Sequence, residues 1–350
     1  MTWRITSASE PGTSHLRRGL ACQDAHASWQ DRGSGTAVLA VADGAGSARR
    51  AGDGSRIAVI TAVDACMRRL TASEHGAPDS AEAWEGFLRY TLEAVRYEIE
   101  RAAAEGPNTA AAQEGLRVDT DAEVDAEEDD GAVDRSTCGS DTEPKDDSNT
   151  ANGTAWPVTD ASDGVGAERP VEPFMTFTTV HETESRRSTD RPAPGAALRE
   201  LSTTLLVAVL APRWLACLQV GDGVIVARHG GGLEAITRPA KGEYANQTDF
   251  VTMDEYVTRA QVRVLQRDDV DALAVMSDGL EALAVELASN TPFAPFFESL
   301  FAFASSDHHV QAVYSEALAQ ELRSDKVNRL TDDDKTLVVA TRTACASEQG

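Results

Sequence analysis

The sequence predicts an α+β fold, an antiparallel β-sandwich flanked by helices and interrupted by a long acidic disordered insertion. Short apolar runs bounded by turn residues occur in two groups, one in each half of the chain, and indicate strands joined by short links. Helix-period segments follow each group, and a stretch without apolar periodicity separates the two halves. Strands followed by helices, twice over, are typical of antiparallel sheets with helices packed outside them.

The N-terminal half begins with strand patterns and continues with two helices. Strands are expected over residues 3–9, 25–30 and 36–42, and helices over residues 53–70 and 80–103. In the first of these helices the apolar residues recur near the helical spacing, which places them on one face: Ile57, Ile60, Val63 and Met67.

The C-terminal half repeats this order. Six strands are expected, over residues 202–210, 214–220, 223–228, 233–236, 259–266 and 271–276. Three helices follow near residues 280–288, 294–304 and 310–322, and a closing strand begins at Thr336. The links between neighbouring strands are short, which favours antiparallel pairing.

The segment 105–195 differs from both halves in composition. It holds 22 acidic and 7 basic residues, and residues 119–130 alone hold eight acids. Such a segment buries too little apolar surface to offset the entropy of ordering, so we expect it to be mostly disordered, with one strand-like island at 174–180. An acidic docking or autoinhibitory role is the alternative. Residues 1–104 and 196–345 then form a single interrupted domain.

Composition and charge exclude several function classes. The chain has 350 residues, 41% of them hydrophobic, and a net charge of −25, which argues against a nucleic-acid partner. The longest apolar runs have seven residues, too few to cross a membrane, and the start of the chain lacks the apolar core of a signal peptide. Five scattered cysteines suit a reducing compartment, so we expect a cytoplasmic location. Cys22, beside Asp24, is either a nucleophile or a buried inert thiol.

Three apolar runs each lead directly into an Asp-Gly pair, at Asp43, Asp222 and Asp278. A single Asp-Gly pair reads first as a hairpin turn. Three pairs at strand ends, together with the acidic triplet 332–334 before the closing strand, predict carboxylates gathered on one rim of the sandwich if that strand runs antiparallel to the others. Crowded carboxylates repel one another unless a cation neutralises them, and ligands that are all oxygen favour Mg²⁺ or Mn²⁺ over zinc.

These residues also match a known family in order and spacing. The matching motifs are Ser14-His15 with Gly19 and Cys22-Gln23-Asp24-Ala25, Val41-Ala42-Asp43-Gly44-Ala45-Gly46, Ser202-Thr203-Thr204, Val220-Gly221-Asp222-Gly223, Ser277-Asp278-Gly279 and Asp333-Asp334-Lys335-Thr336. The series resembles the metal-dependent protein phosphatases of the PP2C type, in particular their bacterial branch. It covers both ends of the chain and skips only the acidic insertion.

The resemblance implies a fold, a reaction and a set of ligands. It implies a β-sandwich with a binuclear Mg²⁺ or Mn²⁺ centre at one end, at which a water molecule activated by two metals hydrolyses phosphoserine and phosphothreonine. Carried over residue by residue, Asp43 matches the carboxylate that bridges both metals and Gly44 a main-chain carbonyl ligand. Asp278 and Asp333 match ligands of the other metal, with Asp334 the alternative one position along.

Two further acids and two departures from the family pattern complete these implied roles. Asp24 matches the acid that holds metal-bound water, and Asp222 the acid that holds a third, weaker ion together with Asp278. A phosphate-binding arginine usual in the family is replaced here by Gly19, for which Arg17, Arg18 or His15 are candidate substitutes. A histidine that usually follows the first Asp-Gly pair is replaced by Ala45, and His15 is either its substitute as general acid or a structural residue.

The loop features leave a smaller set of expectations. The glycine-rich stretch around residues 44–54 fits no nucleotide motif and indicates a metal-site turn that leads into a helix N-terminus. Residues 246–249 lie where phosphatases of this type often carry a mobile flap, and we expect these residues to have a role on the substrate side of the site.

We therefore expect a metal-dependent serine/threonine protein phosphatase that acts on a phosphorylated protein and opposes a kinase. The alternatives are a weakly active or inactive member that binds phosphoproteins, and a phosphatase of small phosphate esters.

Overall fold

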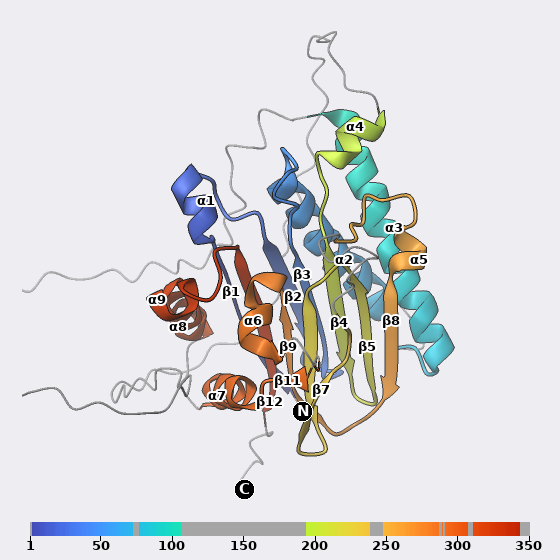
Figure 1. Cartoon of the computed structure of the whole chain (residues 1–350). Coiled ribbons are helices and arrows are strands. Elements are labelled where there is room, and N and C mark those ends of the chain that lie inside the picture. Colours follow the sequence, from blue (N-terminus) through green and yellow to red (C-terminus); the bar gives the residue numbers. More distant parts are fainter. Residues whose placement is uncertain are drawn as a thin grey trace, which may run out of the picture. The chain divides into compact units, whose positions relative to one another are not determined.

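The computed structural model describes residues 2–72, 77–106, 194–238, 248–286, 289, 291–306 and 311–343. Most described strands belong to two five-stranded sheets (Figure 1). The first has the order β1-β12-β9-β6-β7: β1 (Thr2–Glu10), β12 (Lys335–Thr343), β9 (Val270–Met276), β6 (Val224–His229) and β7 (Gly232–Ala235). The second has the order β2-β3-β4-β5-β8: β2 (Ala25–Asp31), β3 (Thr36–Ala42), β4 (Leu205–Ala211), β5 (Trp214–Val220) and β8 (Gln261–Gln266).

Every neighbouring pair in both sheets is antiparallel. The closing strand β12 lies between β1 and β9, and Leu337 stands opposite Met276 at the start of the β12–β9 pairing. The closing strand thus runs antiparallel to its neighbours, as the predicted gathering of acids requires, and the start of β12 lies beside the end of β9. Since β3 and β5 both pair with β4, they run in the same direction and end at the same edge.

The inner faces of the two sheets share one core. That core includes Leu39 and Val41 of β3, Ile225 of β6 and Val338 of β12. All seven residues of β3 and of β4 are buried, because one face of each strand meets the other sheet and the opposite face meets helices. Burial on both faces explains why these strands read as continuous apolar runs without a period of two.

Helices cover both outer faces of the sandwich (Figure 1). Over the second sheet lie α2 (Ala51–Ala72) and α3 (Ala81–Glu105), and Trp84 of α3 is fully buried there. Over the first sheet lie α7 (Ala294–Ser305) and α8 (Gln311–Arg323), and Phe297 and Phe301 of α7 belong to a separate apolar cluster between these helices and the sheet. The predicted α+β sandwich flanked by helices is thus confirmed for the described residues.

The structure corrects some predicted element boundaries. The predicted helix 280–288 is a 3-10 turn η1 (Asp278–Leu280) and a single helical turn α6 (Glu281–Ala284), followed by the strand β10 (Val285–Glu286), which pairs with β11 (Thr291–Pro292). Phe293 N–H donates to the carbonyl of Ala284, which ends the helix there. The predicted strand 202–210 begins only at Leu205; before it, Thr203 forms an isolated bridge with Gly44, and the side chains of Thr203 and Thr204 bond the main chain of Asp43.

Short elements escaped the sequence patterns because a single helical turn has no apolar period. They are α1 (Thr13–Arg18), α4 (Pro194–Arg199), α5 (Tyr256–Arg259) and α9 (Asp325–Asn328). The strand-like island at 174–180 lies outside the described residues. In the described part of the chain, each helix falls short of the length or the apolar character that crossing a bilayer requires.

Candidate metal centre

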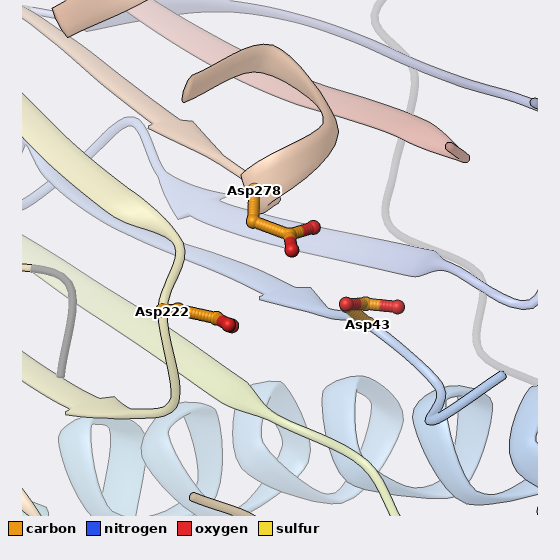
Figure 2. A group of neighbouring side chains, drawn as sticks. All are labelled: Asp43, Asp222 and Asp278. Atoms are coloured by element: carbon orange, nitrogen blue, oxygen red, sulfur yellow. The ribbon is translucent and has the colours of Figure 1, made fainter. Parts of the chain in front are cut away.

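Three aspartates from three strand ends meet at one rim of the sandwich. Asp43 follows β3, Asp222 follows β5 and Asp278 follows β9. Each offers a carboxylate oxygen, and these oxygens all lie within 4.8 Å of one another. Figure 2 shows the three side chains directed into a common space from separate segments. The chain therefore gathers acids more than two hundred residues apart, as the Asp-Gly pattern predicted.

The glycine after each of these aspartates is required by close packing of backbones rather than by a hairpin turn. None of the three has a positive φ. A Cβ added to Gly44 would lie 2.7 Å from the carbonyl oxygens of Ala51 and Gln23. A Cβ on Gly223 would meet the Met276 carbonyl, and one on Gly279 would meet the Asp334 carbonyl. The Asp-Gly pairs thus mark places where neighbouring segments converge on the rim.

The main chain of Asp43 is fixed by the two threonines before β4. Asp43 N–H donates to Thr204 Oγ1 over 2.8 Å, and Thr203 Oγ1 donates to the Asp43 carbonyl over 2.9 Å. Thr204 N–H reaches the same carbonyl over 2.8 Å. These bonds leave the Asp43 carboxylate as the part of the residue directed at the centre.

Asp24 lies close to this group, because its charge contributes to the raised pKa values of Asp43 and Asp278. It is 8% exposed, and its Oδ2 accepts a hydrogen bond from Ser277 Oγ over 2.7 Å. Ser277 Oγ in turn accepts from the N–H of Thr336 over 3.0 Å, so β12 and the end of β9 position Asp24 together. Sequence reasoning assigned a role to Asp24 but none to Ser277, although Ser277 belongs to the motif that contains Asp278.

Several carboxylate oxygens at the centre lack partners. The Oδ1 atoms of Asp24, Asp222 and Asp278 are buried and have no hydrogen-bond partner among the residues that the structure describes. A buried, unpaired carboxylate oxygen costs free energy unless a proton or a cation satisfies it. Three such hard oxygen donors around one space suit Mg²⁺ or Mn²⁺. The residues present therefore fit the divalent cations implied by the resemblance.

The pKa values of these four carboxyl groups are all raised, as expected for buried acids close together. Burial, followed by the charges of Asp222 and Asp333, raises the pKa of Asp278 to about 8. Burial raises the pKa of Asp24 to about 6, and burial together with the charges of Asp24 and Asp278 raises the pKa of Asp43 well above its usual value. Burial also raises the pKa of Asp222. Without a cation, protons partly neutralise these acids.

The acidic triplet divides into three different roles. Asp332 is exposed and forms an ion pair of 3.4 Å with Arg17. Asp333 is exposed, and its charge contributes to the raised pKa values of Asp43 and Asp278, so it lies near the group without being among its three closest carboxylates.

Asp334, in contrast, is buried and fully engaged. Its Oδ1 accepts the N–H of Gly12 over 2.7 Å, and its Oδ2 accepts the N–H of Gln23 over 2.6 Å and His15 Nδ1 over 2.8 Å. The side chain thereby ties the segment before Asp24 to the start of β12. These three bonds leave it little capacity to bind anything else.

The remaining predicted residues lie farther from the acids or are committed elsewhere. His15 is 3% exposed and bonded to Asp334, which favours the structural alternative over a general acid. Arg17 pairs with Asp332, and Arg18 Nε donates to the Ser14 carbonyl over 3.3 Å on the same short helix α1. Burial, with the charges of Asp24 and Asp334, raises the pKa of the Cys22 thiol, which disfavours a nucleophilic role.

The flap region contributes one direct contact. Thr248 Oγ1 donates to Asp222 Oδ2 over 2.6 Å, and buried Asp249 pairs with Arg259 over 3.1 Å. Asn246 and Gln247, predicted with them, lie outside the described residues. The described end of the flap thus lies against the acid that the resemblance links to a third ion.

A cavity of about 500 Å³ opens beside Asp24. One wall is the run from Leu20 to Ala25, and the other is the start of α2 with the loop before it. The second wall carries three arginines, Arg49, Arg50 and Arg56, together with Asp53. Sequence reasoning treated this loop only as a metal-site turn and missed its arginines as a group.

Comparison with solved structures supports this fold. A crystal structure of a bacterial serine phosphatase matches with a TM-score of 0.50 at 11% identity, covering 97% of this chain and 98% of that one. A Caenorhabditis elegans sex determining protein matches with a TM-score of 0.50 at 10% identity, covering 97% of this chain and 65% of that one. At these identities the likeness shows a shared fold alone.

The family follows from two sequence comparisons. A family model described as protein phosphatase 2C matches residues 11–130 and 136–323. Serine/threonine-protein phosphatase 3 of Escherichia coli (strain K12) is 24% identical over 344 residues, which are 97% of this chain and 98% of the relative. The chain belongs to the protein phosphatase 2C family, and it is an enzyme of the protein serine/threonine phosphatase class. The resemblance stated from the motifs is confirmed.

The different roles of the triplet can be separated by stability measurements. Asp334→Asn should lower the free energy of unfolding by about 2 to 3 kcal/mol, because buried hydrogen bonds to a charged acceptor are lost or weakened. Asp332→Asn, which changes the same side chain on an exposed pair, should change it by less than about 0.5 kcal/mol. Urea unfolding followed by circular dichroism measures both. Equal effects would contradict the assignment of Asp334 as the structural member.

Proton binding by the acidic group gives a second prediction. With EDTA present, folded Asp278 has a pKa of about 8, above the roughly 3.9 of an unfolded aspartate, so the folded state holds the extra proton between these values. Rising pH removes that proton, and the thermal midpoint should fall between pH 5 and pH 8. Asp278→Asn should flatten this slope, whereas exposed Asp268→Asn should leave it unchanged. A slope unaffected by Asp278→Asn would show that the acids do not repel one another as described.

Proposed function

We propose that this phosphatase hydrolyses phosphoserine and phosphothreonine on proteins with two divalent cations, Mg²⁺ or Mn²⁺, held at the acidic rim. The observation that carries this proposal is the set of buried, unpartnered carboxylate oxygens on Asp24, Asp222 and Asp278, which face the same region as Asp43. Oxygen ligands of this kind suit hard cations.

The ligands follow from the family pattern and from where the side chains lie. We assign Asp43 as the residue that would hold both ions, and the Gly44 carbonyl as a further group that would hold one of them. Asp278 and Asp333 would hold the other ion, and Asp222 with Asp278 would hold a third. When bound, the cations would lower the pKa of a water molecule for attack on phosphorus and neutralise the phosphoryl oxygens.

The chain's own residues orient the reactants. Asp24 would accept a hydrogen bond from the attacking water, and its position is fixed by Ser277, whose hydroxyl is bonded to β12. His15 and Asp334 act on this geometry indirectly, since they hold Gln23, the residue next to Asp24. We therefore assign His15 to positioning rather than to proton donation.

The substrate class follows from the enzyme class. We propose that the partners are phosphorylated proteins, that the enzyme opposes a serine/threonine kinase in signalling, and that it works in the cytoplasm. The Escherichia coli relative, named a serine/threonine-protein phosphatase, supports the reading, as does the negative charge of the chain, which disfavours nucleic acid.

A turnover assay tests the reaction and its two rivals. Hydrolysis of p-nitrophenyl phosphate and of a phosphothreonine peptide should require Mn²⁺ or Mg²⁺. Asp43→Ala and Asp278→Ala should each lower kcat/KM by at least about 100-fold, because a metal ligand supports several kcal/mol of transition-state stabilisation.

The controls decide between outcomes. Asp268→Ala, an exposed aspartate beyond the rim, should retain wild-type turnover. Activity on the aryl ester alone would favour a phosphatase of small esters. Tight phosphopeptide binding without turnover under any cation would favour a phosphoprotein-binding member, and either result would overturn the proposal.

We also propose that residues 1–104 and 196–345 form one catalytic domain and that 105–195 is an insertion outside it. Its acidic composition cannot support a core of its own, and all the assigned ligands lie outside it. Deleting residues 107–192 should leave the thermal midpoint and the metal-dependent turnover largely intact. Loss of the cooperative transition by circular dichroism would show that the segment belongs to the fold, and increased turnover would point to the autoinhibitory alternative.

A further inference from the structure

The cavity beside Asp24 combines two kinds of charge. Asp24 lines it, and the charge of Asp24 also helps to raise the pKa of Asp43, so the cavity reaches one member of the acidic group. The opposite wall carries Arg49, Arg50 and Arg56 in a protein whose net charge is −25. A local cluster of guanidinium groups on such a chain is suited to an anionic ligand.

Two of the three arginines are already committed. Asp53 accepts Arg50 Nε over 3.2 Å on one oxygen and an Arg56 nitrogen over 2.9 Å on the other. Arg50 also reaches the Ala102 carbonyl of α3 over 3.5 Å. These contacts hold the start of α2 and neutralise part of the charge on this wall.

Arg49 differs from its neighbours. Its side chain is exposed at the cavity, and it forms no hydrogen bond or ion pair with any residue that the structure describes. A ligand can therefore bind this guanidinium without breaking an ion pair within the described residues, which lowers the cost of association.

The substrate phosphate needs such a cation. The position five residues before Asp24 is Gly19, which ends α1 in the left-handed conformation and has no side chain to offer. Arg17 is held in a pair with Asp332, Arg18 bonds within α1, and neither lines the cavity. Of the three substitutes considered from sequence, His15 is buried against Asp334. None of them presents a free cation beside Asp24.

We propose that Arg49 binds the phosphoryl oxygens of the substrate and takes the place of the arginine that Gly19 does not supply. The inference rests on the proposed function. Its planar guanidinium can donate two N–H bonds to two phosphoryl oxygens of a substrate that enters the cavity. Because Arg49 belongs to the loop between Asp43 and α2, the same loop that begins with a metal ligand also holds the phosphate.

Kinetics of the full chain with Mn²⁺ test this assignment. Arg49→Ala should lower kcat/KM by about 10- to 100-fold on both p-nitrophenyl phosphate and a phosphothreonine peptide, the effect expected from losing hydrogen bonds to a charged group. Inhibition by inorganic phosphate should weaken by a similar factor, and Arg49→Lys should recover part of both. The thermal midpoint should stay unchanged because the side chain is exposed.

A matched control and a rival variant complete the design. Arg32→Ala removes the same charge from an exposed site before β3, at the opposite end of that strand from Asp43, and should behave as wild type. The Arg17→Ala/Arg18→Ala double variant tests the rival assignment. The proposal is overturned if this double variant shows the loss instead, or if Arg49→Ala keeps wild-type inhibition by phosphate. A loss confined to the peptide would also overturn it, since Arg49 would then bind peptide rather than phosphate.

Direct binding separates this inference from the function it rests on. Calorimetric titration of inorganic phosphate into the Mn²⁺-loaded wild type and the Arg49→Ala variant does not depend on turnover. Weaker binding to the variant supports the role of Arg49 even if the wild type hydrolyses neither substrate, which would refute only the proposed function. Equal binding refutes the role of Arg49 while leaving any observed hydrolysis in place.

Discussion

Four carboxylates, those of Asp24, Asp43, Asp222 and Asp278, are buried or half-buried within reach of one another, and their mutual repulsion constrains everything around them. Burying several carboxylates together costs free energy unless an opposite charge or a proton compensates them. The fold holds it together by anchoring each acid to backbone that is rigid for other reasons: three strand ends, two threonines before β4 and the hydroxyl of Ser277. The stability of the sandwich thereby maintains a site that is unfavourable by itself, a pattern common at functional centres.

Packing of main chain against main chain is the means by which the acids approach so closely. Gly44, Gly223 and Gly279 each lie where a single added carbon would collide with another segment. Because each glycine directly follows one of the clustered aspartates, the same dipeptide supplies both the charge and the space that the charge occupies. The three Asp-Gly pairs in the sequence therefore correspond to three places where the backbone packs closely against another segment.

Much of this could be predicted from the sequence, for identifiable reasons. Apolar runs such as 36–42 and 271–276 are easily recognised as strands, because burial on both faces favours apolar residues almost throughout. The acids at the ends of these runs predicted the group of carboxylates at one rim of the sandwich. Asp333 and Asp334 are the same residue type side by side, so only the backbone course could assign Asp334 to Gly12, His15 and Gln23. That Arg49 forms no ion pair within the described residues could not be predicted either, since it depends on Asp53 binding Arg50 and Arg56 instead.

The pairing of β1 with β12 has a consequence for biosynthesis. Strand β1 lies at the edge of its sheet and can pair only after β12, more than three hundred residues later, has left the ribosome. Contacts between segments so distant in sequence form slowly and late. Asp333, Asp334 and the N–H of Thr336 arrive with that last partner, so a growing chain holds an incomplete centre throughout translation. The topology itself delays catalytic competence until synthesis of the domain is finished.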